Sequence, residues 1–342
     1  PPGAGPGQGP KQLQMVVTLA GTLGLTGYRQ AEALDALRGL QLLVEKAGTV
    51  GRLQKITLKL DIRDDKGIES EALAQYKLMM NTAEDEKNPY IFMGPIMPEL
   101  SEKIARLANA TGRLLILPYT GLPHALLVNQ SSTISMAESA DNSMNHAIAR
   151  LRAKGAKTMS VWTGNSHYQQ AMCKGAALFA AKSGMQVVIE VQRAPENDLT
   201  HSIDDDLRTI SHFRPDVFLG CTTLDEAVSI MSMAGKLRYN PPAFLLADSE
   251  GAAFVDAVGA VGASEVISPV SWDWDVPSCD ELCAAYPNEV CEECWIFRSK
   301  AEFVEAFQKK FGGDSPGFHA AASAAAAMAV IYQAWVEMKS EA

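Results

Sequence analysis

The sequence of 342 residues lacks an uninterrupted apolar run of the ~20 residues that a membrane-spanning helix needs. The nearest approach is 320–330, which is mostly alanine and is followed by polar residues from Gln333 onward. We interpret it as a tightly packed buried helix. The N-terminus also lacks the basic region and apolar core of a signal peptide. Since Pro1 is not an initiator methionine, we expect the chain to be a processed or trimmed product.

Basic residues are outnumbered in this chain. There are 30 Lys and Arg against 40 Asp and Glu, which gives a net charge of −10. Nucleic-acid phosphates and anionic membranes both require a basic face on their partner, so the composition argues against both. Hydrophobic residues make up 47% and charged residues 20%, as in an ordinary folded protein. The length suggests about two domains.

Motifs of catalysis are also missing. The sequence has no G-x-S-x-G nucleophile elbow, no H-E-x-x-H motif and no phosphate loop ending in G-K-[ST]. The aspartates 204–206 are typical of a solvated helix start, because acids favour the first turn. We therefore predict a protein that is not an enzyme and uses no cofactor. Six scattered histidines are interpreted as surface or satisfied residues (His124, His146, His167, His201, His212 and His319).

A glycine-rich loop, Gly21-x-x-Gly24-x-x-Gly27, invites comparison with dinucleotide-binding turns. Its spacing differs from G-x-G-x-x-G. The acid Asp61 lies about 40 residues past Gly21, whereas the dinucleotide fingerprint requires about 20. We interpret the loop as a flexible strand-to-helix turn beside a ligand cleft.

Four of the six cysteines crowd into one segment, namely Cys279, Cys283, Cys291 and Cys294. Four thiolates could hold zinc tetrahedrally. Alternatively, they could form two disulfides that stabilise an inserted segment without a hydrophobic core of its own. The connectivity of such disulfides cannot be read from the sequence. We favour disulfides, which imply an oxidising compartment. Cys173 and Cys221 fall on separate predicted elements and are interpreted as buried free thiols.

Apolar runs alternate with amphipathic helices along most of the chain, after a Pro/Gly-rich segment 1–11 that is expected to be disordered. Such alternation predicts an α/β fold with parallel sheets covered on both faces. The rhythm restarts near Ser139, which indicates two successive units. Strands are predicted at 15–20, 56–62, 90–93, 114–117, 158–162, 186–191, 217–219, 243–246 and 266–272. Helices are predicted at 28–47, 69–82, 98–110, 145–154, 167–183, 203–213, 224–237, 252–258, 300–311 and 318–338.

The order of several short motifs resembles the type I periplasmic binding proteins, in their branched-chain amino acid-binding branch, and the related receptor ectodomains. The resemblance runs from Met15 to Met338, apart from the Cys-rich segment. The motifs that carry it are Thr18-Leu-Ala-Gly-Thr-Leu-Gly-Leu-Thr-Gly27, Phe92-Met-Gly-Pro95, Leu117-Pro-Tyr-Thr120, Val161-Trp-Thr-Gly-Asn-Ser-His-Tyr168, Pro215-Asp-Val-Phe-Leu-Gly220 and Phe318-His-Ala-Ala-Ala.

This resemblance implies two Rossmann-like lobes joined by a hinge, with the ligand between them. We expect lobe 1 to comprise 12–130 and 273–330, with a Cys-rich insertion at 275–297, and lobe 2 to comprise 131–272 and 331–342. Open α/β sheets bind ligands at the carboxyl ends of their strands. The cleft is therefore expected at the loops 21–27, 94–97, 118–121, 164–168, 221–224 and 248–251.

The family's site roles can be carried over residue by residue. The carboxylate-binding loops of lobe 1 correspond to the backbone of Ile96 and Met97 and to Tyr119, Thr120 and Gly121. The family commonly has a hydroxyl residue in the first of these loops, where this chain has Ile96-Met97-Pro98. An α-carboxylate clamp therefore departs from the usual pattern here.

The lobe 2 roles follow in the same way. Tyr168 corresponds to an aromatic that covers the ligand, and Thr222 or Thr223 to a further contact. Glu250 corresponds to the acid that receives a ligand ammonium, with Asp248 as the alternative. Phe318, near the end of the chain, corresponds to a side-chain wall. Tyr168 could instead pack at a helix start, Phe318 could belong to the core, and Glu250 could be an exposed loop acid.

The resulting hypothesis is a periplasmic or extracellular protein that closes by a hinge on an amino acid or a similar small polar or carboxylate compound. It would serve a membrane permease of an ABC transporter, or be the ectodomain of a receptor with its own transmembrane region. The second possibility arises because the chain stops at Ala342, where the family usually adds further strands. A cytosolic ligand-sensing regulator and an α/β enzyme are the rival hypotheses. The sequence does not indicate an oligomeric state.

Overall fold

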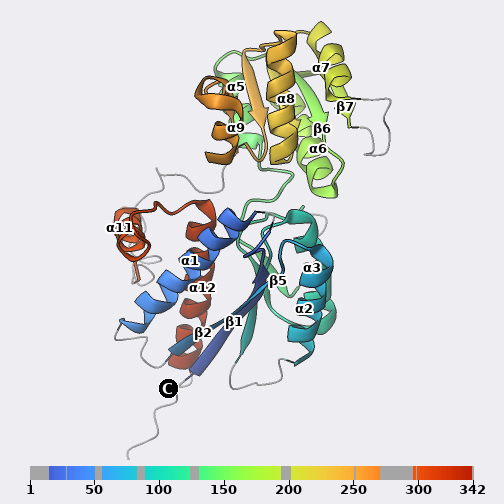
Figure 1. Cartoon of the computed structure of the whole chain (residues 1–342). Coiled ribbons are helices and arrows are strands. Elements are labelled where there is room, and N and C mark those ends of the chain that lie inside the picture. The colour runs from blue at the N-terminus through green and yellow to red at the C-terminus, as the bar shows by residue number, and fades with distance from the viewer. Residues whose placement is uncertain are drawn as a thin grey trace, which may run out of the picture.

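The computed structural model shows two lobes, stacked one above the other in Figure 1. The structure describes residues 15–27, 29–50, 56–82, 89–123, 131–193, 202–249, 252–269, 296–297 and 299–340. Each lobe is a parallel five-stranded sheet with helices on both faces, which confirms the predicted α/β class.

The first sheet has the strand order β2-β1-β3-β4-β5, and all of its paired strands run parallel. Strand β1 lies between β2 and β3 and is buried along most of its length, as its mostly apolar sequence predicts. The strands are β1 (Met15–Leu23), β2 (Ile56–Asp64), β3 (Tyr90–Met93), β4 (Leu115–Leu117) and β5 (Thr133–Ser135).

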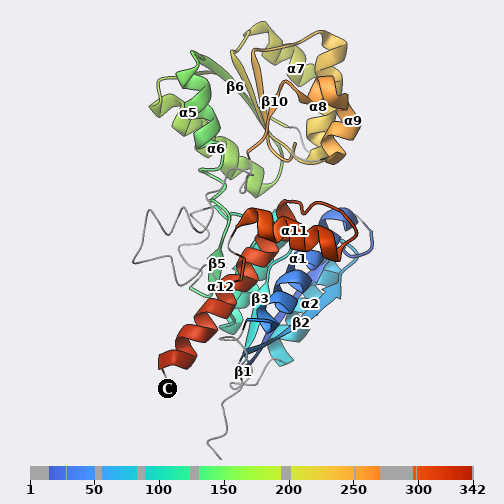
Figure 2. The same cartoon turned by 90° about the vertical axis from the view of Figure 1, so that its left-hand side faces the viewer.

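Two separate apolar cores flank this sheet. One lies under α2 (Glu69–Thr82) and α3 (Pro98–Thr111), and the other under α1 (Gln30–Gly48), α11 (Lys300–Lys310) and α12 (Phe318–Ser340). Figure 2 shows α1, α11 and α12 together on one side of the lobe. Helices α1 and α12 pack so closely that a Cβ atom on Gly39 would lie 2.1 Å from the carbonyl oxygen of Ala320.

The lobe boundaries differ from the sequence-based ones at two places. Strand β5 hydrogen-bonds to β4, so the first sheet extends past residue 130. Residues 331–342 were assigned to lobe 2, but Ile331 and Ala334 are buried in the core beneath α1. The reason is that α12 continues without a break past residue 330, so Ile331 and Ala334 lie on the same helix as the lobe 1 core residues before them.

The second sheet has the order β10-β9-β8-β6-β7, which repeats the strand order of the first sheet. Its strands are β6 (Thr158–Thr163), β7 (Gln186–Gln192), β8 (Val217–Cys221), β9 (Ala243–Leu246) and β10 (Val266–Ile267). One face is covered by α5 (Asn145–Ala153) and α6 (His167–Lys182). The other face is covered by α7 (Ile203–His212), α8 (Leu224–Leu237) and α9 (Ala252–Ala263).

Local sequence fixes where several lobe 2 helices begin. Ser166, Ser202 and Thr223 each cap a helix with their side-chain oxygen, and each is matched three residues later by a Gln, Asp or Glu that bonds back to the cap. These capping boxes satisfy backbone N–H groups that a helix start leaves without partners. They hold the starts of α6 and α8 at the edge of the sheet that faces lobe 1 (Figure 1).

The cysteine prediction was wrong for one pair. Cys173 on α6 and Cys221 at the end of β8 form a disulfide with Cα atoms 5.8 Å apart, where the sequence indicated free thiols. The reason is tertiary: β8 lies beside β6, and α6 packs over both, so two cysteines 48 positions apart meet. The cluster from Cys279 to Cys294 lies outside the described residues, as does the segment 1–11.

Candidate functional site

A cleft of about 160 Å³ lies between the lobes, at the carboxyl ends of the strands in both sheets. In each sheet, two neighbouring strands lead to helices on opposite faces of the sheet. These strands are β1 and β3 in the first sheet and β6 and β8 in the second. Doubly wound sheets bind ligands at this switch point. The loops from both switch points contribute to the cleft: Ile96 follows β3, Tyr168 and Gln169 follow β6, and Thr222 follows β8.

Lobe 1 forms one wall with the loop after β4. The hydroxyl of Thr120 donates to the Ile96 carbonyl at 3.4 Å and is itself almost fully buried. At Gly121 a Cβ atom would lie 1.5 Å from the carbonyl oxygen of Glu138, so only glycine fits. Ala140 N–H also donates to the Gly121 carbonyl at 2.9 Å. The segment that crosses between the lobes is thus bonded directly to the cleft wall.

An aromatic wall comes from the start of α12. The Tyr119 ring lies 5.5 Å from the His319 ring, and the Phe318 ring lies 5.2 Å from the His319 ring. The Tyr119 hydroxyl is hydrogen-bonded to Ser323 at 2.6 Å, so this group faces the helix, and burial raises the pKa of Tyr119. Burial, followed by the charge of Arg29, lowers the pKa of His319 to about 3, so its ring is neutral near pH 7.

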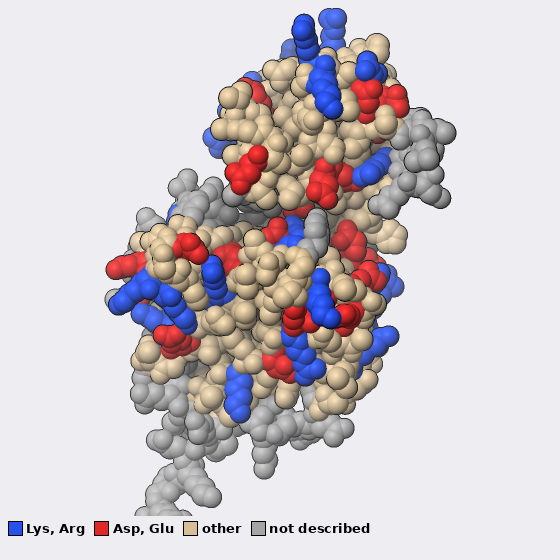
Figure 3. All heavy atoms as spheres, viewed as in Figure 1, with Lys and Arg blue, Asp and Glu red and all other residues tan. Residues whose placement is uncertain are grey.

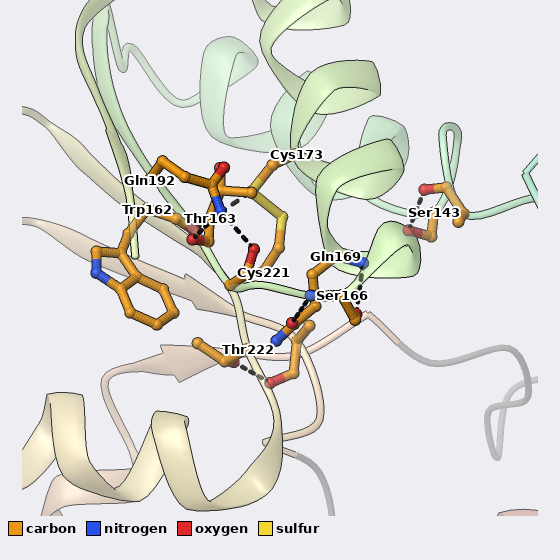
Figure 4. The surroundings of a disulfide bond; sticks show 12 residues. Ser143, Trp162, Thr163, Ser166, Gln169, Cys173, Gln192, Cys221 and Thr222 are labelled. Carbon is orange, nitrogen blue, oxygen red and sulfur yellow. Dashed lines mark hydrogen bonds between the residues drawn. A yellow bond between two sulfur atoms is a disulfide. The ribbon is translucent and has the colours of Figure 1, made fainter. Parts of the chain in front are cut away.

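Lobe 2 forms the opposite wall with the starts of α6 and α8. Thr222 donates its hydroxyl to the Ala247 carbonyl at 2.6 Å. The amide of Gln169 accepts from Ser166 N–H at 3.0 Å and donates to Glu226 at 2.7 Å. Figure 4 shows Gln169 and Thr222 close to the Cys173–Cys221 disulfide, which ties α6 to β8 one residue before Thr222. The disulfide therefore braces this wall.

One ion pair spans the cleft. Arg29, immediately before α1, donates from Nη2 to Asp248 Oδ1 of lobe 2 at 3.1 Å. The second oxygen of Asp248 accepts from the backbone N–H of Leu224, the first residue of α8, at 3.2 Å. Glu32 pairs with the Arg29 guanidinium from within lobe 1. Among the described residues that line the cleft, Arg29 is the sole lysine or arginine.

Most of the predicted site residues lie together in this cleft, namely Ile96, Tyr119, Thr120, Gly121, Tyr168, Thr222, Asp248 and Phe318. Met97 is instead the N-cap residue of α3 and lines a smaller cavity beside the cleft. Thr223 is the exposed N-cap of α8, where its hydroxyl oxygen accepts from Glu226 N–H at 3.4 Å. Glu250 lies outside the described residues.

Several cleft residues were not predicted. The acids Glu99 and Glu138 and the polar residues Ser143, Gln169 and His319 line it as well. Arg29 is the most consequential omission. Its position directly after the glycine-rich loop of β1 was a usable signal, because that loop was itself predicted to border the cleft.

Two absences apply to the described parts of the chain. No helix there combines the length and apolar character needed to cross a membrane. Across the same ranges, no group of three His, Cys, Asp or Glu side chains is arranged to hold a metal ion.

Two α/β lobes that enclose a cleft at facing strand ends have the architecture of two-lobed solute-binding proteins. The family model for the periplasmic binding proteins matches residues 16–339. The chain belongs to this family, which is one of solute-binding proteins and not of enzymes, and which implies a periplasmic or extracellular location. No curated protein matches the sequence.

Solved structures share the fold at low sequence identity. A leucine binding protein from Thermotoga maritima is 17% identical, with a TM-score of 0.69 over 93% of this chain and 81% of that one. A substrate binding protein of a branched-chain amino acid transporter from Streptococcus pneumoniae, in complex with isoleucine, is 17% identical (TM-score 0.65, 93% and 83%). An ABC transporter substrate-binding protein from Desulfitobacterium hafniense, in complex with Leu, is 15% identical (TM-score 0.68, 96% and 84%). These likenesses concern the fold.

Proposed function

We propose that this protein binds an amino acid, or a similar small polar or carboxylate compound, in the cleft between its lobes and closes on it. The observation that carries the proposal is the cleft itself, which is lined by switch-point loops of both sheets. A ligand there touches both lobes at once. Contacts made to both lobes stabilise the closed form selectively, which is the requirement for a ligand-driven closure.

The lining of the cleft fits such a ligand. Apolar surface comes from Ile96, Met172 and Phe318, while Thr120 and Thr222 place polar groups on opposite walls. Small-molecule sites typically combine an apolar lining with a few placed polar groups. Leucine and isoleucine are the ligands in two proteins of the same fold, which makes amino acids the first compounds to test.

The Cys173–Cys221 disulfide supports a periplasmic or extracellular place of action, since disulfides persist in oxidising compartments. The natural partner of such a protein is a membrane permease of an ABC transporter, which reads the closed form. A receptor ectodomain would use the same closure to signal to its own transmembrane region.

A thermal-shift screen of the twenty standard L-amino acids, with their amides and deaminated acids, tests the proposal. A ligand at 100 times its dissociation constant adds about 2.7 kcal/mol of stability. We expect at least one amino acid to raise the melting temperature. The bound compound should be recovered unchanged by mass spectrometry. If no compound stabilises the protein, or if the ligand is converted to a product, the proposed function is wrong.

A further inference from the structure

The position of Arg29 suggests a role beyond holding the lobes together. Its backbone lies in the left-handed region (φ 62), which a non-glycine residue adopts only when its surroundings fix it. It lines the cleft and also the small cavity that Ile96 and Met97 border. The guanidinium thus lies beside the loop 96–98, where the family's usual hydroxyl residue is replaced.

The partner of Arg29 is a carboxylate presented by the opposite lobe. Asp248 also has a left-handed backbone (φ 51) and reaches across the cleft from the loop after β9. Figure 3 shows acidic and basic side chains at the seam between the lobes as well as over the rest of this face. Both side chains remain partly exposed, at 20% for Arg29 and 30% for Asp248. An entering ligand can therefore reach the pair.

We propose that Arg29 is the carboxylate-binding residue of this cleft, and that the ligand's carboxylate replaces that of Asp248 on its guanidinium. The released Asp248 then receives the ligand's ammonium group. The ligand class is a small zwitterion with a free carboxylate and a free ammonium. This inference rests on the proposed function and specifies how the same cleft selects its ligand.

Charge balance favours a zwitterion over a ligand that carries only one of the two charges. A zwitterion brings one charge of each sign, so Arg29 and Asp248 both remain paired after the swap. A carboxylate without an ammonium would leave Asp248 without Arg29, and an amine without a carboxylate would have to compete with Arg29 for Asp248. A half-buried charge that loses its partner is costly. His319, which lines the same cleft and whose pKa is lowered to about 3, is neutral and adds no competing cation.

Preorganisation makes Arg29 suitable for this role. Glu32 holds the guanidinium from within α1, with one bond from Nη2 at 3.2 Å, so the fork is oriented before the ligand arrives. The planar guanidinium carries five donors in fixed directions, so it holds Glu32 through Nε and Nη2 and a second carboxylate, that of Asp248, through Nη2 at the same time, in a geometry that a lysine ammonium lacks. The Asp248 carboxylate shows that such a group fits the position.

The test uses calorimetric titration with three probes: the L-amino acid that stabilises the wild type most in the screen above, its primary amide and its deaminated acid. In the wild type we expect the amide and the acid each to bind at least about 30-fold more weakly than the amino acid. In Arg29→Gln the amino acid should lose at least about 30-fold, while the amide, which no longer competes with Arg29 for Asp248, should bind at least as tightly as it does to the wild type, so that the preference for the amino acid is lost.

The variant Asp248→Asn should raise the affinity for one of the three probes. It removes the carboxylate that competes for Arg29, so the deaminated acid should bind more tightly than it does to the wild type. Arg38→Gln is the matched control, because Arg38 lies on α1 in an exposed pair with Asp314 at 3.0 Å, away from the cleft. It should leave all three affinities unchanged.

Circular dichroism melts establish that each variant is folded. If Arg29→Gln fails to fold, Arg29→Lys keeps the charge without the fork, and it should reduce the preference for the amino acid over its amide. The inference is overturned if a folded Arg29 variant keeps the wild-type ratio of amino acid to amide affinity, or if Asp248→Asn weakens the deaminated acid. Absence of binding by every amino acid to the wild type overturns the proposed function and this inference together.

Discussion

Removal of the Cys173–Cys221 disulfide should destabilise lobe 2 and loosen one wall of the cleft. The bond closes a loop with a sequence separation of 48, for which the chain-entropy relation gives about 4 kcal/mol at 25 °C. We expect the double variant Cys173→Ala/Cys221→Ala to lose a stability of this order in urea denaturation. The variant is preferable to a reductant alone, because the sequence has four further cysteines.

Hydrogen exchange measured peptide by peptide locates the effect. Peptides from β6, α6 and β8 should lose protection, while those from β1, α1 and α12 should keep it, because the bond joins elements of lobe 2 only. The reduced wild type keeps the two cysteine side chains, so it controls for the packing that the alanine substitutions remove. Its lobe 2 peptides should show the same hydrogen-exchange protection as those of the double variant. An equal loss of protection in both lobes, or a stability change below about 1 kcal/mol, would refute this reasoning.

Two further predictions concern lobe 1. Gly39→Ala places a Cβ atom against the Ala320 carbonyl, so α1 and α12 must separate, and we expect a loss of about 1–3 kcal/mol in thermal or urea denaturation. An unchanged melting temperature would contradict the close helix contact. The pKa of His319 is about 3 in the folded chain and 6.5 ordinarily, so the unfolded chain binds more protons between these values. Stability should therefore fall as the pH drops from about 6.5 towards 3, and His319→Gln should lessen that fall in melts at several pH values. Parallel pH profiles for the two proteins would argue against a buried neutral ring.

Much of the fold could be predicted because its elements carry strong local signals. Helix α2, strand β3, helix α8 and strand β9 begin and end at the predicted residues. Strand β5 was missed because it is a three-residue edge strand whose central Ile134 is half exposed, so it has no apolar run to detect. Residues 331–342 were assigned to lobe 2, whereas Ile331 and Ala334 belong to the continuous helix α12 and lie in the lobe 1 core.

The candidate site likewise contains some residues that local sequence predicts and others that only the assembled fold brings together. Residues such as Tyr119, Thr120 and Thr222 lie in the cleft because they directly follow strands, and strand ends can be predicted from the sequence. The Cys173–Cys221 pair could not be predicted in this way, because its two members meet only when β6, β8 and α6 are assembled.

The pair formed by Arg29 and Asp248 depends on one further level of structure, the placement of the lobes against each other. Each residue has a local origin: Arg29 precedes α1 after the first switch-point loop, and Asp248 follows β9. Neither position identifies the other, since they lie 219 positions apart in the sequence and belong to different lobes. The same strand order in both lobes directs their strand ends to a common cleft, and there two strained backbones aim opposite charges at each other. A ligand that supplies both charges can replace this contact without leaving either residue unpaired. For that reason the pair connects the fold of this protein to the kind of molecule that it would select.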